Sequence, residues 1–395
     1  MKRTASAYIM AAAVFLASGC SQKNEAETVN IGILHSRTGS MAISEQPLRD
    51  AEMLAVNELN EAGGVLGKRI VVIDEDGESD SHTFVEKAKK LITEDNAVSV
   101  FGCWTSASRK AVKPVFEEFY SLLWYPVQYE GMEASPNIIY TGAAPNQQVV
   151  PAVNYFVNKF GKRVFLIGSD YIFPRTANRI IKAELKDLEC ECVGEEYVIL
   201  GRSDFEPLIK EILKQKPDVI FNTLNGDSNI AFFNQLKAAC ISADMIPVMS
   251  FSIAEEEVSK IGIENICGHY VAWNYFQTTD TEANRDFIKK YRASYGESRV
   301  TSDPIVAAYS AVHLWAKAVE KAGCFDTEKV RIAAKGLSFD SPGGTVTIDG
   351  QNQHLYKTVR IGKINESGTI EEVWTSDEQI KPDPYLSAYA WAWGM

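Results

Sequence analysis

Hydrophobic and polar positions alternate along this chain in two periods, one typical of strands and one typical of helices. From residue 29, short runs rich in β-branched and aromatic residues alternate with amphipathic segments whose apolar residues recur every three or four positions. The pattern predicts strands at 31–35, 70–75, 98–102, 122–126 and 138–141, and helices at 44–62, 81–94 and 106–119. This order is typical of a mostly parallel sheet with helices on both faces.

A second series of the same kind follows residue 145. Strands are expected at 164–168, 192–200, 219–224, 247–251 and 269–276, and helices at 147–160, 174–188, 204–215, 227–239 and 254–260. Helices at 283–294, 304–322 and 328–334 and strands at 345–348, 357–364 and 369–374 complete the chain. Two such series in 395 residues predict an α/β protein with two doubly wound parallel-sheet lobes.

Four polar loops stand directly after predicted strands. The carboxyl ends of parallel strands leave a crevice flanked by helix N-termini and free backbone amides, so ligands are expected there. The loops lie at 103–106, 127–130, 169–171 and 225–228. Thr105 and Ser106 fit an N-cap, which would satisfy the first amides of the helix, and they also fit donors to a ligand carbonyl.

The other loops offer hydrogen-bond acceptors and aromatic rings. Gln128 and Glu130 flank an aromatic ring, and Asn225 and Asp227 offer acceptors from the second series. Trp104, Tyr129 and Tyr171 are candidate walls, with packing against the following helix as the alternative for each. An acceptor-rich pocket with flat aromatic walls suits a small, planar, uncharged ligand that carries several N–H donors.

The first residues are typical of an export signal. Lys2 and Arg3 precede an apolar run at 8–16, which is shorter than the roughly 20 residues that a membrane-spanning helix needs. Ala-Ser-Gly then precedes Cys20, and this run resembles a lipobox, in which the cysteine thiol carries a diacylglycerol. We therefore expect a lipoprotein signal peptide at 1–19, lipidation at Cys20 and a polar tether at 20–28 that holds the body to the membrane.

Composition narrows the function. The chain is 46% hydrophobic and carries a formal net charge of −12, which indicates a globular protein and argues against nucleic-acid binding. The six cysteines after Cys20 permit disulfides without establishing any, and the five histidines form no zinc-binding spacing. We expect no metal and no cofactor.

The sequence contains no complete catalytic motif. The glycines at 62–69 have the wrong spacing for a phosphate-binding P-loop and are more typical of a helix end, and 35–40 is not a dinucleotide fingerprint. Cys103 follows a strand, as a nucleophile would, but no partner base can be assigned to it. An amidase is therefore a minor alternative, and no catalytic residue is predicted.

Several longer runs carry a family resemblance. They read GCWTSASRKA at 102–111, YPVQYEG at 125–131, YTGAAPNQQ at 140–148, GSDYIFPRTA at 168–177 and FNTLNGDSN at 221–229. With these runs the chain closely resembles the substrate-binding components of urea uptake ABC transporters, within the branched-chain amino acid and amide binding family. The resemblance covers nearly all of the chain after the tether.

The resemblance implies a type I periplasmic-binding-protein fold, in which the chain crosses between two lobes three times and closes on its ligand. Lobe 1 would comprise 29–144 and 276–345, and lobe 2 would comprise 145–275 and 346–395. It also adds Ser252 to the site and implies capture of urea and delivery to a permease at the periplasmic or extracellular face of the membrane. Acetamide, formamide, an amino acid, or an amide-sensing role remain alternatives.

Overall fold

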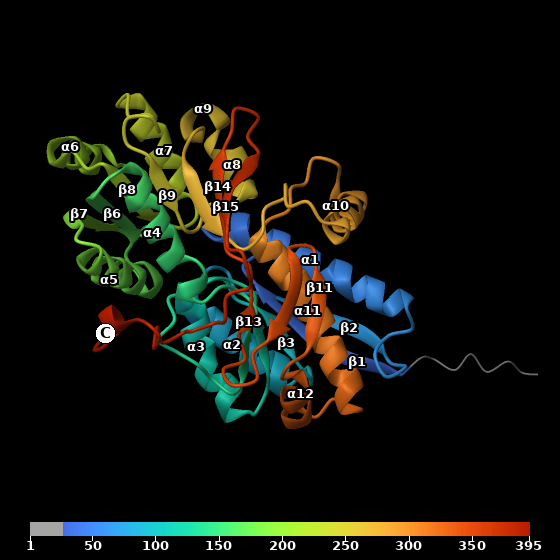
Figure 1. The fold of residues 1–395 in the computed structure, drawn as a ribbon. Helices are drawn as coiled ribbons and strands as arrows, with labels where there is room; N and C mark the ends of the chain where they lie inside the picture. Colours follow the sequence, from blue (N-terminus) through green and yellow to red (C-terminus); the bar gives the residue numbers. More distant parts are fainter. Residues whose placement is uncertain (1–26) are drawn as a thin grey trace, which may run out of the picture.

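The computed structural model describes residues 27–395, and most of its strands form two separate sheets (Figure 1). The predicted signal peptide, Cys20 and the tether up to residue 26 lie outside the described residues. The prediction of an α/β fold with parallel-sheet lobes is confirmed. Within the described part of the chain, no helix is long and apolar enough to cross a membrane.

The first sheet is parallel throughout. Its spatial order is β2 (Arg69–Asp76), β1 (Thr28–His35), β3 (Val100–Gly102), β4 (Leu123–Tyr125) and β5 (Ile138–Tyr140). Its helices are α1 (Ala42–Glu61), α2 (Ser81–Thr93), α3 (Ser106–Glu118), α10 (Glu282–Tyr295), α11 (Asp303–Ala322) and α12 (Thr327–Ala334). The Phe101 ring lies 6.0 Å from Trp124 and 5.9 Å from Trp315, so α11 packs directly on the sheet.

The second sheet has a parallel centre and an antiparallel edge. Its order is β15 (Ile370–Thr375), β14 (Arg360–Ile364), β10 (Tyr270–Trp273), β9 (Val248–Ser250), β8 (Val219–Thr223), β6 (Arg163–Ser169) and β7 (Glu191–Val198). Its helices are α4 (Val149–Phe160), α5 (Ile172–Asp187), α6 (Glu206–Gln215), α7 (Ser228–Ala238), α8 (Glu255–Ile261) and α9 (Ile263–Ile266). Successive residues of β6 enter two different cores, as expected for a sheet covered on both faces.

A small antiparallel sheet corrects the predicted lobe boundary. It contains β11 (Ser338–Ser341), β12 (Gly344–Ile348) and β13 (Leu355–Tyr356). The boundary predicted at residue 345 falls inside β12, and Val346, Ile348 and Leu355 are buried in the core of the first lobe. Residues 346–356 thus pack with the first lobe, because β12 pairs with its hairpin neighbour β11.

Three segments connect the two main sheets, at 141–148, 274–281 and 357–359. Asn274 holds the three together, because its side-chain amide donates to the Gln147 carbonyl at 3.0 Å and to the Thr358 carbonyl at 3.1 Å. The side chain is buried. One buried side chain on the second crossover therefore hydrogen-bonds to both of the others.

Candidate ligand-binding site

The start of α3 lies in the first lobe, just beyond the carboxyl end of β3. Thr105 caps the helix, and its hydroxyl accepts from the Ser108 amide at 3.0 Å. The amides of Ser106 and Ala107 belong to the first turn, where helical partners are lacking. The capping role predicted for Thr105 is confirmed, and the two amides beside it have no partner within the helix.

A buried polar cluster surrounds Ser106. The Ser106 hydroxyl donates to Glu130 Oε2 and accepts from Arg109 Nη1 at 3.0 Å. Arg109 Nη2 donates to Glu130 Oε1 at 3.1 Å, and Arg109 Nε donates to Glu133 Oε1 at 2.9 Å. Burial by itself would lower the pKa of Arg109, but Glu130 and its neighbours raise that pKa well above its usual value. The guanidinium is therefore a permanent cation between two carboxylates.

The charges of this cluster balance. Glu130 and Glu133 contribute two acids, Arg109 contributes one base, and Lys110 Nζ lies 2.8 Å from Glu133 Oε2. Burial favours the neutral form of Glu133, but Arg109 and Lys110 outweigh it and lower the pKa of Glu133 to about 2. Glu130 is therefore a carboxylate that is paired with Arg109 inside the cluster.

The three predicted aromatic walls have different surroundings. Trp104 is buried, and its backbone carbonyl accepts from the Tyr125 hydroxyl at 2.5 Å. Tyr129 lies inside the first lobe, with its ring 4.5 Å from the Arg109 guanidinium carbon and its hydroxyl 2.6 Å from His354 Nε2. The Tyr129 ring thus stabilises the Arg109 guanidinium by a cation–π contact.

Tyr171 stands in the second lobe, directly before α5. Its side chain is half-buried, and its ring lies 6.5 Å from the ring of Phe173, measured between centroids. Burial raises the pKa of Tyr171 well above its usual value, and the charges of Tyr125 and Glu130 add to this. Of the three predicted walls, this one belongs to the second lobe.

Gln128 also joins the lobes. Its side-chain nitrogen donates to the Phe251 carbonyl at 2.9 Å and to Ser252 Oγ at 3.2 Å, so the predicted Gln128 and Ser252 meet. Gln128 Oε1 is buried and has no hydrogen-bond partner within the described chain. A buried acceptor without a donor is costly, and a ligand N–H would satisfy it.

Asn225 and Asp227 of the loop at 225–228 have different surroundings. Asn225 is buried, its amide donates to Ser169 Oγ at 3.1 Å, and its side chain donates to the Thr223 carbonyl at 3.1 Å. Asp227 is exposed and does not cap α7. The backbone of Gly226 instead lies against Ser40 of the first lobe, where an added Cβ would come within 3.0 Å of the Ser40 carbonyl oxygen.

The sequence analysis does not predict Arg109, which hydrogen-bonds to the predicted residues Ser106 and Glu130. Arg109 stands three residues after Ser106, on the face of α3 that also buries Val112 and Phe116, and this spacing was the available signal. A contact between lobes was missed as well, in which the Ser44 hydroxyl donates to Glu257 Oε1 at 2.7 Å. Its two partners are 213 positions apart, so no local pattern marks it.

Cys103 is unsuited to nucleophilic chemistry. Its side chain is fully buried, and burial raises the pKa of its thiol, whereas a nucleophile needs a lowered pKa. The six cysteines of the described residues are all unpaired, and the described residues contain no group of histidine, cysteine and acidic side chains arranged to hold a metal.

The family model for the periplasmic binding protein domain matches residues 29–390, so the chain belongs to the periplasmic binding protein family. A relative from Brucella suis biovar 1 (strain 1330), named Leu/Ile/Val-binding protein homolog 6, is 25% identical over 381 residues, which cover 92% of this chain and 95% of the relative. The leucine-, isoleucine-, valine-, threonine- and alanine-binding protein of Pseudomonas aeruginosa is 24% identical over 86% of this chain and 90% of its own.

A solved structure confirms the fold. The solute-binding protein of an ABC transporter from R. palustris, in complex with 4-hydroxybenzoate, superposes with a TM-score of 0.81 at 23% identity and covers 90% of this chain and 98% of its own. At this identity the match establishes a shared architecture. The two sheets and three crossovers are therefore those of a type I periplasmic binding protein.

Proposed function

We propose that the protein is an extracytoplasmic solute-binding protein that captures urea, or a short amide, between its two lobes and delivers it to an ABC permease. The charge balance around Arg109 is the observation that carries this proposal. A cluster whose acids are already paired with bases favours an uncharged ligand beside it over an ion, because burying an unpaired charge is expensive. Binding and release require no covalent change.

Hydrogen-bonding groups in the crevice match an amide. Gln128 Oε1 is an acceptor without a donor, and the first-turn amides of α3 are donors for a carbonyl. Urea and acetamide carry both kinds of group within a few ångströms.

An aliphatic amino acid is the second candidate, because two of the relatives are named for leucine, isoleucine and valine. The α3 amides and Ser106 suit a carboxylate. An ammonium group would need an unpaired carboxylate, and Glu130 is paired with Arg109. The local electrostatics therefore favour the amide.

Titration calorimetry of the purified protein separates the candidates. We expect urea or acetamide to bind with a stoichiometry of one, and isoleucine and 4-hydroxybenzoate to give no heat beyond dilution. Saturable binding of isoleucine would replace the amide with an amino acid. If none of the panel binds, the ligand assignment falls.

We also propose that Cys20 carries the lipid anchor. Cys20 lies outside the described residues, and the support is its sequence context, an apolar run followed by small residues. We expect cells fed radiolabelled palmitate to label the parent protein and not the Cys20→Ser variant, which should appear in the soluble envelope fraction. Equal labelling of both would contradict the anchor.

A further inference from the structure

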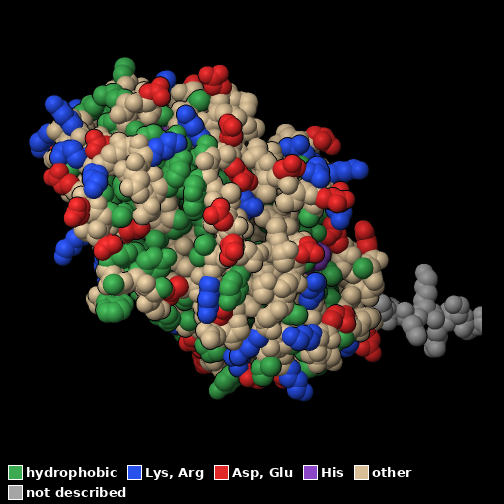
Figure 2. All heavy atoms as spheres, viewed as in Figure 1, with side chains coloured by type: hydrophobic (Ala, Val, Ile, Leu, Met, Phe, Trp, Pro, Cys, Tyr) green, Lys and Arg blue, Asp and Glu red, His purple; other side chains and the backbone are tan. Residues whose placement is uncertain are grey.

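A cavity of about 650 Å³ lies on the second lobe, between α4, α5, the end of β15 and the C-terminal segment. Figure 2 shows hydrophobic side chains gathered on this face, over α4 and the C-terminal segment. The residues of the crevice cluster do not line this cavity. A volume of this size is ordinary for a small-molecule site.

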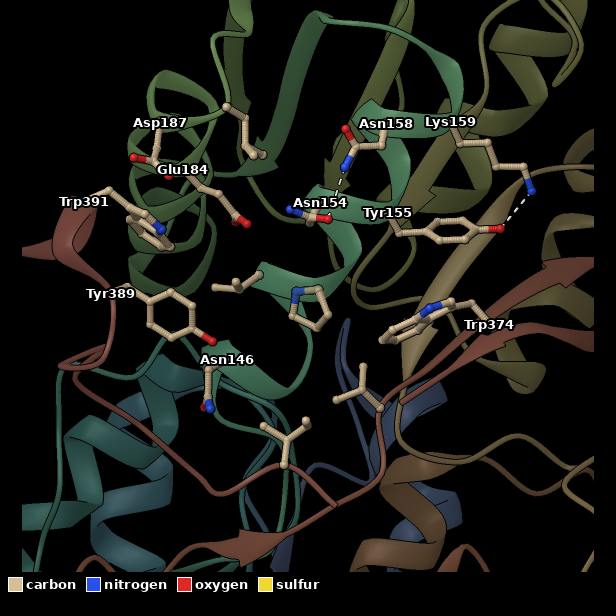
Figure 3. Close-up of a pocket in the computed structure, with 15 residues that line it drawn as sticks. Asn146, Asn154, Tyr155, Asn158, Lys159, Glu184, Asp187, Trp374, Tyr389 and Trp391 are labelled. Atoms are coloured by element: carbon tan, nitrogen blue, oxygen red, sulfur yellow. Dashed lines mark hydrogen bonds between the residues drawn. The ribbon is translucent and has the colours of Figure 1, made fainter. Parts of the chain in front are cut away.

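Aromatic rings form much of the cavity wall. Trp374 of β15 lies 6.3 Å from Tyr155 of α4, and Trp391 of the C-terminal segment lies 5.3 Å from Tyr389, measured between ring centroids. All four side chains line the cavity (Figure 3). Ring faces carry partial negative charge, so they attract cations.

Glu184 of α5 brings an unpartnered carboxyl group to this wall. The residue is only 3% exposed, and its Oε2 has no hydrogen-bond partner within the described chain. Figure 3 shows its carboxyl group pointing across the cavity toward Asn154 of α4. A buried carboxyl group without a partner destabilises the fold unless a ligand or a proton compensates it.

We propose that this cavity is a second ligand site, which takes a small organic cation such as an amine or a quaternary ammonium compound. The cation would face the Glu184 carboxylate and rest on the tryptophan and tyrosine rings. The Lys159 ammonium also lies at the wall, but it donates to the Tyr155 hydroxyl at 2.8 Å and points away from Glu184. The proposal is independent of the crevice ligand.

Protonation of Glu184 supplies a distinctive signature. Burial, and then the charge of Asp187, raises the pKa of Glu184 to about 9, so the free protein holds a neutral acid at pH 7. A bound cation favours the carboxylate, so binding releases a proton. Affinity should therefore rise roughly tenfold per pH unit up to about pH 9 and level off above it.

The other titratable groups around Glu184 do not reproduce this profile. Burial raises the pKa of Tyr389 and of Cys190, so neither group gains a charge at a lower pH than usual. On α4, the hydrogen bond with Tyr155 raises the pKa of Lys159, which keeps that ammonium charged. Asp187 is an exposed acid on the same helix.

The test is titration of the purified protein with choline and with 3,3-dimethylbutan-1-ol, the uncharged compound of the same shape, followed by calorimetry and tryptophan fluorescence. We expect choline to bind at least tenfold more tightly than the alcohol, with proton release visible as a dependence of the heat on the buffer. Glu184→Gln should remove the preference and the pH dependence and leave urea binding unchanged. The matched control is Glu189→Gln, an exposed acid on the turn after α5, which should change nothing.

Equal binding of choline and the alcohol, or choline affinity unaltered by Glu184→Gln, would overturn the proposal, as would a lack of choline binding up to millimolar concentration. Because urea binding is measured in the same samples, a failure here is distinguishable from a failure of the crevice assignment.

Discussion

Arg109 organises the crevice wall at the scale of single residues. It is fully buried, contacts Ser106, Glu130 and Glu133, and lies over the rings of Tyr125 and Tyr129 at 4.9 and 4.5 Å. A buried guanidinium persists only when its charge and its N–H groups are satisfied. Positions that touch Arg109 are therefore sensitive to substitution even when they never touch ligand.

Removal of Glu130 tests this dependence. Glu130→Ala leaves Arg109 with Glu133 alone, and breaking a buried pair in this way typically destabilises a protein by about 3–5 kcal/mol. We expect a lower midpoint in guanidinium chloride and no measurable urea binding. Asp227→Ala is the control, because Asp227 is exposed, and we expect its stability and its urea binding to match the parent. Loss of binding in Asp227→Ala instead would restore the predicted role of that residue.

His35 is a second buried charge, at the end of β1. Burial alone would lower its pKa, but Glu52 and Glu45 outweigh burial and raise the pKa to about 10. His35 Nε2 lies 3.1 Å from Glu52 Oε1. The folded protein therefore holds the proton of His35 over a pH range in which the unfolded chain, with a pKa of about 6.5, has released it.

The resulting dependence on pH has a definite sign. The extra stability from His35 is complete below about pH 6.5 and is lost as the pH rises toward 10, because the folded state binds more protons over that range. We expect the difference in unfolding free energy between the parent and His35→Gln to shrink across this window. The matched control is His82→Gln, at an exposed histidine. A constant difference from pH 6 to 10 would show that His35 is neutral.

At the scale of helices and strands, the junction between β3 and the following loop determines where that loop lies. Gly102 ends β3 and has φ +145°, and a Cβ there would lie 2.0 Å from the Leu34 carbonyl oxygen of β1. The glycine lets β3 run close beside β1 and turn into the loop that presents Trp104 and Thr105.

Two glycine substitutions separate the backbone effect from the contact. Gly63 also has positive φ, +106°, but nothing lies within 4 Å of an added Cβ. We expect Gly63→Ala to destabilise by about 1 kcal/mol from strain alone, whereas Gly102→Ala should cost several times more because the strand pair must separate. Thermal unfolding of both variants gives the comparison. Equal losses of stability in the two variants would mean that β3 can move away from β1 at little energetic cost.

Many of the helices and strands could be predicted from the local periodicity of the sequence. The strand predicted at 164–168 lies within β6, and the helix at 106–119 matches α3 apart from its last residue. The direction of β14 could not be predicted, because it depends on pairing Tyr270 with Lys363, far apart in sequence. The ion pair between Arg109 and Glu130 could not be predicted for the same reason. The N-cap at Thr105 could be predicted, because it depends on neighbouring residues only.

At the scale of the whole molecule, the lobes meet through polar contacts. Hydrogen bonds join Gln128 to Ser252 and Ser44 to Glu257. The Ser302 hydroxyl also donates a hydrogen bond to Glu256 Oε1 at 2.8 Å. When the lobes separate, water can replace the partners in these polar contacts. Opening and closing of the crevice therefore exposes little buried apolar surface. A ligand that bonds both lobes would favour the closed arrangement.

A crystal structure of the protein grown with urea tests the central claim most directly. We predict that urea lies between the lobes, with one nitrogen within hydrogen-bonding distance of Gln128 Oε1 and its carbonyl oxygen facing the first-turn amides of α3. Closed lobes with no urea between them, or a charged amino acid retained from the cells in its place, would contradict the account.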